Sequence, residues 1–355
     1  MPAPLDRRAF GARFASLLAA PLLPALPRVA QAAGGAYGER PEAMQWASAL
    51  AAHYSLPEPW VRAAIAQAQF LPRVPRLMLP AAPSSRNWRS YRRRMVEPVR
   101  IRAGARFWRQ HTRALERAHT RYGVPPEIVC GILGIETLYG RNMGSFRVLD
   151  ALATLTFDFP ATHPRAAARQ AYFAGELGYF MLLCQRMGLS PGQPLGSYAG
   201  AMGIAQFMPS SWLRYAVDFD GDGSIDLWHS AADAIGSVAS YFAGYGWKAG
   251  VPTHWGVHVA ADADLAQLLA SDITPSMSAA QMRALGATPL GSGAQYGGKL
   301  ALIELPNGTG VPEYVVGSEN FYVVTRYNHS SFYAMAVLEL GEAVAQAVRG
   351  RAAAK

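Results

Sequence analysis

The chain has 355 residues, of which 51% are hydrophobic and only 16% charged, so it can form one large domain or two to three small ones. It contains no internal repeat, transmembrane span or phosphate-binding glycine loop, which argues against a solenoid, a membrane-spanning protein and a P-loop protein. The formal charge of +9 favours anionic partners, either a cell-wall glycan with its carboxylates or nucleic acid.

Residues 1–32 have the pattern of a signal peptide. Basic residues precede an apolar run over 14–26, and Ala30-Gln31-Ala32 is a small-x-small cleavage pattern. We therefore expect export to the periplasm by the general secretory route, with Arg7-Arg8 leaving the twin-arginine route open. The run is broken by Pro21 and Pro24 and is too short to span a bilayer, so no retained membrane anchor is expected. No cysteine follows it, so no lipid attachment site is expected either. Loss of four arginines and one aspartate would lower the net charge by 3, to about +6.

The next stretch is predicted to be helical. Helical patterns cover residues 42–54 and 58–70, a proline-rich loop follows over 72–83, and Pro98 can open a long helix to Tyr122. Before that helix, arginines alternate with aromatic residues, which fits either a polymer-binding strip or a solvated basic face. The strip comprises Arg86, Trp88, Arg89, Tyr91, Arg92, Arg93 and Arg94.

Residues 125–144, PPEIVCGILGIETLYGRNMG, place one carboxylate in an apolar helix. Pro125-Pro126 suit the first helical turn, and Gly140 is expected to stop the helix. Glu136 would then lie among hydrophobic residues near the helix C-terminus, where desolvation and the helix dipole both disfavour its ionised form. The alternative is an ordinary surface glutamate. Gly131 and Gly134 would allow close approach of a neighbouring backbone or a substrate.

A further helix is predicted over residues 164–187, ended by Gly188 and carrying Arg169, Tyr172 and Glu176 on neighbouring turns. Glu176 is the nearest second carboxylate, and a structural role is the preferred interpretation. Cys130 and Cys184, the only cysteines, could form a disulfide in an exported protein or remain buried thiols.

Residues 197–212, SYAGAMGIAQFMPSSW, combine a turn rich in small residues with Pro209, which can open a helix. Gln206 is the lone amide in this apolar setting. It needs hydrogen-bond partners, which could be sugar groups or the protein itself.

Residues 218–229, DFDGDGSIDLWH, resemble an EF-hand calcium loop. Four carboxylates this close repel each other unless a cation lies between them. His229 stands where the bidentate glutamate is expected, and Asp233 could replace that ligand or form a capping box with Ser230. The predicted role of calcium is structural, and no cofactor is expected for catalysis. The candidate ligands are Asp218, Asp220, Asp222, Ser224, Asp226 and Asp233.

The pattern changes after Gly246. Short strands are predicted over residues 253–259, 299–305, 313–316 and 321–325, and a closing helix over 332–348.

Together these segments resemble the lytic murein transglycosylase B family of periplasmic, peptidoglycan-cleaving enzymes. The likeness covers nearly all of the mature chain and is carried by GILGIETLYGRNMG, SYAGAMGIAQFMPSS, the acidic loop, DAIGSVASYF and FYVVTRYNHS. It implies that Glu136 is the catalytic acid and base. It also implies that the sugar-binding groove is lined by Arg169, Tyr172, Ser197, Gln206, Tyr241, Tyr327 and Asn328. The family pairs two arginines before Tyr172-Phe173, whereas this chain has Ala168-Arg169.

The resemblance implies a mainly α (α+β) fold. We expect a helical domain over 34–125 completed by 326–349, a lysozyme-like core over 126–250 with the calcium loop 218–229, and a small β domain over 251–325. The expected reaction is non-hydrolytic cleavage of the MurNAc–GlcNAc bond, leaving 1,6-anhydroMurNAc ends. A hydrolytic muramidase and a non-catalytic, calcium-stabilised wall-binding protein are the alternatives. The expected partners are peptidoglycan strands and, as further candidates, penicillin-binding proteins or other wall-synthesis enzymes, but not nucleic acid.

Overall fold

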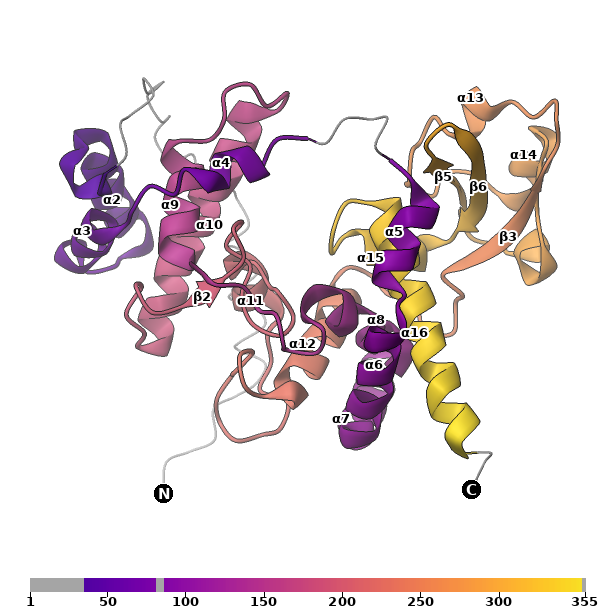
Figure 1. Ribbon diagram of the computed structural model, residues 1–355, viewed down its shortest axis with the longest axis horizontal. Coiled ribbons are helices and arrows are strands. Elements are labelled where there is room, and N and C mark those ends of the chain that lie inside the picture. Colours follow the sequence, from indigo (N-terminus) through magenta and orange to yellow (C-terminus); the bar gives the residue numbers. More distant parts are fainter. Residues whose placement is uncertain (1–34, 81–85, 353–355) are drawn as a thin grey trace.

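The computed structural model describes residues 35–80 and 86–352, so the predicted signal peptide over 1–32 lies outside the described residues. Figure 1 shows two groups of helices side by side and a small sheet beyond the second group. The prediction of a mainly α fold with a small β component is confirmed. Within the described residues, no helix is both long and apolar enough to cross a bilayer.

The first group of helices contains the N-terminal segments η1 (Tyr37–Glu39), α2 (Pro41–Tyr54), α3 (Glu58–Gln67) and α4 (Arg73–Leu77). They pack against one another and against α9 (Val148–Phe157) and α10 (Ala166–Met187). A buried pair joins the two parts: Arg40 contacts Asp158 at 2.8 Å, and the Tyr37 hydroxyl donates to the same carboxylate at 2.6 Å. The predicted helices over 42–54 and 58–70 are present, although the second ends at Gln67 and α4 interrupts the predicted proline-rich loop.

The second group contains α5 (Trp88–Met95), α6 (Pro98–Gln110), α7 (Thr112–Tyr122), α8 (Pro126–Thr137) and α16 (Ser331–Ala352). The helices predicted as one unit over 34–125 are therefore shared between the two groups. The prediction of one helix from Pro98 to Tyr122 is wrong, because the backbone leaves helical geometry at His111 (φ −119°, ψ 24°). The Thr112 hydroxyl donates to the Trp108 carbonyl at 2.9 Å, a local bond of the kind that competes with regular helix.

Helices α8 and α16 touch backbone to backbone. A Cβ atom on Gly131 would overlap the Val337 carbonyl, and one on Gly341 would overlap that of Glu127. The sequence indicated that either a neighbouring backbone or a substrate approaches Gly131. In the structure it is the backbone of α16. This contact brings the C-terminal helix alongside the helix that carries Glu136.

Helix α8 ends three residues before the predicted stop at Gly140. Thr137 is its last residue, and Leu138 (φ 51°) and Tyr139 (φ 58°) both take the left-handed conformation without being glycine. Such strain persists only where packing enforces it. Here the Tyr139 ring occupies a notch formed by Gly104 and Gly134, where any side chain would overlap its hydroxyl.

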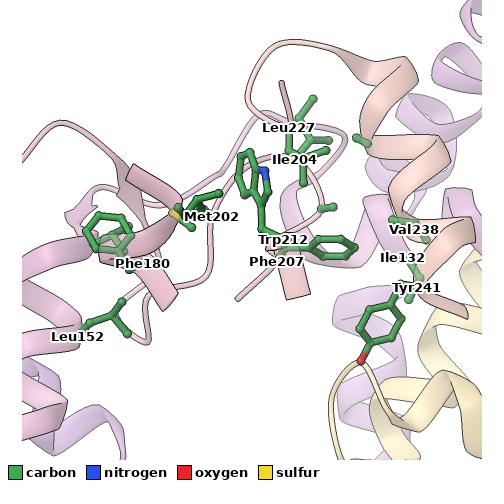
Figure 2. Close-up of a cluster of buried hydrophobic side chains, with 14 of the residues drawn as sticks. Ile132, Leu152, Phe180, Met202, Ile204, Phe207, Trp212, Leu227, Val238 and Tyr241 are labelled. Atoms are coloured by element: carbon green, nitrogen blue, oxygen red, sulfur yellow. The ribbon is translucent and has the colours of Figure 1, made fainter. Parts of the chain in front are cut away.

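Between the groups lie α11 (Pro209–Tyr215), α12 (Ala231–Gly244) and the two-stranded pair β1 (Phe146–Arg147) and β2 (Leu195–Gly196). Figure 2 shows that side chains from the segment Met202–Phe207 reach both groups. Met202 lies near Leu152 and Phe180, whereas Phe207 points toward Tyr241. One continuous core of buried residues therefore passes under this segment.

The small sheet is antiparallel, in the order β4-β3-β6-β5. Its strands are β3 (His254–Val259), β4 (Ala287–Pro289), β5 (Ala301–Asn307) and β6 (Gly310–Gly317), with α13 (Leu265–Leu268), α14 (Ala279–Ala284) and η3 (Gly291–Gln295) in the connections. A separate cluster of buried residues, including Leu268, Met282 and Leu302, forms its own core.

The strand predicted over 321–325 is wrong, since these residues belong to α15 (Glu319–Thr325). The Ser318 side chain caps this helix by accepting a bond from the Asn320 N–H at 3.1 Å. The cap, together with burial of Phe321, Val323 and Val324, overrides the β propensity of the valines. Strand β4, in turn, was not predicted.

Candidate active site

Glu136 lies in the last turn of α8, as the sequence predicts, at the floor of a site covered by aromatic residues of α16 and the preceding loop. Its side chain is only partly exposed, and the Tyr333 hydroxyl donates a hydrogen bond to its Oε1. Burial, and after it the nearby Glu136 carboxylate, raises the pKa of Tyr91 on α5 and of Tyr327, so both rings lie near Glu136. Residues from two distant parts of the chain, α5 and the stretch 327–333, thus surround the carboxyl group.

Burial raises the pKa of Glu136 from its ordinary value of 4.5 to about 7. The cause is desolvation, since an ionised carboxylate loses its water shell among apolar and aromatic neighbours. The Tyr333 hydrogen bond acts in the opposite direction by stabilising the carboxylate. A carboxyl group with a pKa near 7 can both give up and take back a proton at neutral pH.

An aromatic cluster surrounds Tyr327. Its ring lies parallel to that of Tyr333, with centroids 6.4 Å apart, and contacts Tyr241 at 4.9 Å. The Tyr327 hydroxyl donates to the Ala205 carbonyl at 2.5 Å, and that of Tyr241 to the Arg326 carbonyl at 2.7 Å. Tyr241 is buried, so it supports Tyr327 rather than presenting its own hydroxyl to a ligand.

The segment 197–207 forms one wall of the site. The Thr137 hydroxyl ties α8 to this wall by donating to the Ile204 carbonyl at 2.8 Å. Gln206, at a left-handed φ of 49°, donates its amide N–H groups to Met143 O at 3.0 Å and Gly203 O at 2.9 Å. The protein therefore supplies the partners of the Gln206 NH₂ group. The Gln206 carbonyl oxygen has no protein partner among the described residues, so it is available to a sugar group.

Ser197 and Asn328 have different local surroundings. The Ser197 oxygen accepts the N–H groups of Ala199 at 3.3 Å and Ala201 at 3.0 Å, which leaves the hydroxyl proton free to donate. Asn328 is exposed, and within the described chain its amide has no protein partner.

Arg169 and Tyr172 lie on α10. The Arg169 guanidinium stacks on Tyr172 and Phe173, with 5.5 Å and 5.0 Å to the ring centroids. Tyr172 is 43% exposed and bonds to Glu176. Tyr172 does not contact Glu136 directly. It lies near Tyr245, whose ring is 4.6 Å from that of Tyr241 in the aromatic cluster around Tyr327.

Glu176 is 3% exposed and bonded at both oxygens. It accepts the Ser210 N–H at 2.9 Å and the Ser210 hydroxyl at 2.6 Å, at the start of α11. Burial raises its pKa, but both of its oxygens are engaged in holding α10 to α11. The structural interpretation of Glu176 is supported.

Tyr333 and Tyr91 are the neighbours of Glu136 that the sequence alone did not suggest. Tyr333 follows the FYVVTRYNHS motif by three residues, so its proximity to a predicted site residue was the available signal. Tyr91 was predicted as part of an aromatic-basic strip. In the structure Trp88 is 1% exposed and packs with Tyr91 on Phe332, while Arg89 and Arg92 pair with Glu313 and Glu339. The aromatic residues of the strip are therefore packed against the protein, whereas its arginines are exposed, which fits the solvated basic face.

The acidic loop places three carboxylates together at the surface. One oxygen from each of Asp218, Asp220 and Asp222 lies within 4.8 Å of the others. Gly221 (φ 85°) and Gly223 (φ 92°) make the turns that bring them together. Hard oxygen donors at this spacing suit a hard divalent cation.

The remaining predicted ligands lie outside this three-carboxylate cluster. Asp233 is 1% exposed and accepts backbone N–H groups of Phe219 at 2.7 Å, Asp226 at 2.8 Å and Asp220 at 3.3 Å. It acts as a scaffold for the loop, outside the three-carboxylate cluster, and Ser230 caps its helix. Asp226 bonds to the exposed His229 ring at 2.9 Å. The Ser224 N–H donates to Asp222.

Cys130 and Cys184 are both buried and unpaired. The structure therefore has two buried thiols and no disulfide between these cysteines. Burial raises the pKa of each, so both remain in the thiol form.

Comparison with known proteins shows which proteins the chain is similar to. Residues 39–342 match the family model described as Transglycosylase SLT domain. The chain is 42% identical over 326 residues to membrane-bound lytic murein transglycosylase B of Escherichia coli K12, covering 88% of this chain and 85% of the relative.

Two solved structures are similar across most of their length. The Escherichia coli lytic transglycosylase Slt35 in complex with calcium has a TM-score of 0.76 and 40% identity, covering 89% of this chain and 96% of that chain. Pseudomonas aeruginosa SltB3 in complex with NAG-anhNAM-pentapeptide has a TM-score of 0.71 and 30% identity, covering 86% and 79%.

Proposed function

The chain belongs to the transglycosylase SLT domain family, and on this premise we propose that it is a lytic murein transglycosylase that cleaves peptidoglycan between MurNAc and GlcNAc without water. The resemblance inferred from the sequence motifs is thereby confirmed at the level of the family. Enzymatic cleavage of murein is the activity named for its relative. The bond cleaved, the anhydro product and the residues responsible are our proposal.

The observation that carries the proposal is the state of Glu136. It has a pKa of about 7, a single hydrogen-bond donor from the protein and partial exposure to the site. In the proposed reaction it first protonates the glycosidic oxygen, which requires the neutral acid. As the leaving sugar departs, C1 of MurNAc gains oxocarbenium character, which the N-acetyl carbonyl of the same sugar can stabilise.

Glu136, now ionised, then removes the proton from the C6 hydroxyl of that MurNAc. The oxygen attacks C1 and closes a 1,6-anhydro ring, so one carboxyl group serves as acid and then as base. Hydrolysis normally uses two carboxyl groups. Glu176 is the second carboxylate considered, and both of its oxygens are held by Ser210. This favours the intramolecular reaction over a hydrolytic muramidase.

Substrate contacts are proposed for the polar groups that the protein leaves available. The Gln206 carbonyl and the Asn328 amide can bond to sugar hydroxyl or acetamido groups, and Ser197 can donate its hydroxyl proton. The Tyr327 ring offers a flat apolar surface beside Glu136, with Tyr241 behind it. Arg169 and Tyr172 extend the groove along α10.

A structural calcium ion is proposed for the acidic loop. The carboxylates of Asp218, Asp220 and Asp222 fit a hard cation, with Asp226 and the Ser224 carbonyl as further candidate ligands. One relative was solved in complex with calcium. The ion would hold the loop against Arg117, whose guanidinium lies 4.2 Å from the Phe219 ring centroid.

Digestion of purified sacculi tests the proposed reaction. Mass spectrometry of the released fragments should find products lighter by one water than those of hydrolysis. Products with ordinary reducing MurNAc ends would instead identify a hydrolase. Failure to release fragments at all would favour the non-catalytic, wall-binding alternative.

A further inference from the structure

The positive charge of the chain is concentrated in one stretch. Residues 86–124 hold twelve arginines, two glutamates and no lysine, a net charge of +10. Outside this stretch and residues 1–32, the rest of the chain has a net charge of −4. The stretch forms α5, α6 and α7, which follow one another down the middle of the molecule in Figure 1.

Some of these arginines have protein partners. Arg89 and Arg92 form ion pairs with Glu313 and Glu339, and Arg100 donates to the Gly134 carbonyl at 2.6 Å. Four others, on α6 and in the first turn of α7, are exposed and, among the described residues, have neither an ion pair nor a hydrogen bond from the guanidinium. We name this set the arginine stripe: Arg102, Arg106, Arg109 and Arg113.

The spacing of the stripe places it on one face. Arg102, Arg106 and Arg109 fall within an arc of about 60° on α6, roughly opposite Arg100, given a rotation of about 100° per residue. Since Arg100 faces the Glu136 helix, the stripe faces away from the catalytic site. Arg113 continues it into the first turn of α7.

The junction of α6 and α7 extends this basic surface. An open hollow of about 480 Å³ lies there, lined by residues 109–114, including Arg109, His111 and Arg113. The free N–H groups at the start of α7 add to the positive potential. On α6 alone, Arg102 to Arg109 span roughly 10 Å, at about 1.5 Å per residue.

We propose that the arginine stripe is a second wall-binding surface, which contacts the carboxylates of peptidoglycan stem peptides while the cleft holds the glycan strand. This inference rests on the proposed function, since it names a second contact with the same polymer. Guanidinium groups match the geometry of carboxylates and bind them by paired hydrogen bonds. A row of such groups suits a polymer that repeats its carboxylates, because many weak contacts raise the effective affinity together.

Two other anionic partners fit this surface less well. Helices that lie on a membrane insert an apolar face, whereas Gly104, Ala105 and Phe107 of α6 are buried in the protein, and Val99 is the only large apolar side chain exposed on the described α6 and α7. Single-stranded nucleic acid is bound by stacking on accessible aromatic rings. On α6 and α7, Phe107 is buried and Trp108 and Tyr122 are partly buried.

The binding test uses the full mature chain carrying Glu136→Gln, so that the wall is not digested during the measurement. Sedimentation with purified sacculi compares this parent with R102Q/R106Q/R109Q/R113Q. We expect the fourfold variant to bind on the order of tenfold more weakly at low salt. Its affinity should also depend much less on salt than that of the parent.

A matched control separates position from total charge. R106Q/R113Q and R73Q/R76Q each remove two exposed arginines, the second pair from α4 in the other helix group. The first pair should weaken binding about threefold or more, and the control pair less than twofold. Sacculi whose carboxylates are converted to neutral amides should bind the parent no better than the fourfold variant.

Turnover of a soluble, peptide-free glycan fragment separates this inference from the proposed function. With Glu136 intact, the fourfold variant should cleave this fragment within about twofold of the wild-type rate. Absence of cleavage by the wild type would refute the proposed function, whereas the arginine stripe would still be judged by the sedimentation test alone. The proposed role of the arginine stripe would be refuted if the parent and the fourfold variant bound sacculi equally. It would also be refuted if amidation of the sacculi left binding of the parent unchanged. Stripe-dependent binding to phosphatidylglycerol vesicles but not to sacculi would assign the surface to lipid instead.

Discussion

The site around Glu136 and the acidic loop use the same functional group in opposite surroundings. Glu136 is a single carboxyl group among aromatic rings, and desolvation raises its pKa to about 7. Asp218, Asp220 and Asp222 are grouped at the surface and accept backbone N–H groups of the loop, including those of Gly221 and Ser224. Isolation and burial prepare a carboxyl group to exchange a proton, whereas clustering and exposure prepare it to bind a cation.

The largest effect should come from replacing the Glu136 carboxyl group, which is proposed to transfer the proton. Glu136→Gln keeps the shape and can still accept the Tyr333 hydrogen bond, so the fold should be retained while turnover of sacculi falls on the order of a thousandfold or more. Rates of fragment release, together with melting curves, check this.

Glu176→Gln is the matched control, since Glu176 is also a buried carboxylate with a raised pKa. It loses one acceptor for Ser210, so we expect a melting temperature lower by several degrees and activity within about tenfold of wild type. A thousandfold loss in this variant would instead give Glu176 a catalytic role.

The second largest effect concerns the loop. Calcium at a hundredfold excess over its dissociation constant should stabilise the native state by about 2.7 kcal/mol, which corresponds to a rise of roughly 5 °C in melting temperature. Asp222→Ala should abolish this rise and leave substantial activity. Melting curves that are identical in chelator and in excess calcium would show that the loop does not depend on the ion.

A smaller effect should come from removing the Tyr333 hydrogen bond, which changes the pKa of Glu136. The reaction needs the protonated acid, so kcat/KM should fall as the pH rises above about 7. The Tyr333 hydroxyl stabilises the ionised form, so Tyr333→Phe should raise the pKa of Glu136 and move this falling limb to higher pH, by roughly half to one pH unit. A limb that moves to lower pH, or does not move, would contradict the assigned direction of this bond.

The two regions also differ in how far the sequence predicted them. The helix of Glu136 and its raised pKa followed from local pattern, because the apolar run and the helix end lie within a few residues. Local pattern around Glu136 does not predict Tyr333, since Tyr333 is 197 residues away and its position depends on the backbone contact between α8 and α16. In the loop, spacing identified the three clustered aspartates. It could not distinguish a ligand from a scaffold, and Asp233 is committed to three backbone N–H groups.

The sheet and the second helix group show the same limit. The strand predicted over 321–325 failed because burial and the Ser318 cap outweigh β propensity, and the helix predicted over 98–122 failed because a single residue, His111, breaks it. Both depend on tertiary contacts or local bonds that hydrophobic periodicity does not encode.

The central claim is that Glu136 is a neutral acid near pH 7, and the protonation of this group can be measured directly. Infrared difference spectra between wild type and Glu136→Gln, recorded across a pH series, isolate the carbonyl stretch of the protonated carboxyl group. We expect this band to persist above pH 6 and to reach half of its intensity at a pH of about 7. Half-conversion near the ordinary glutamate pKa of 4.5 would contradict the account.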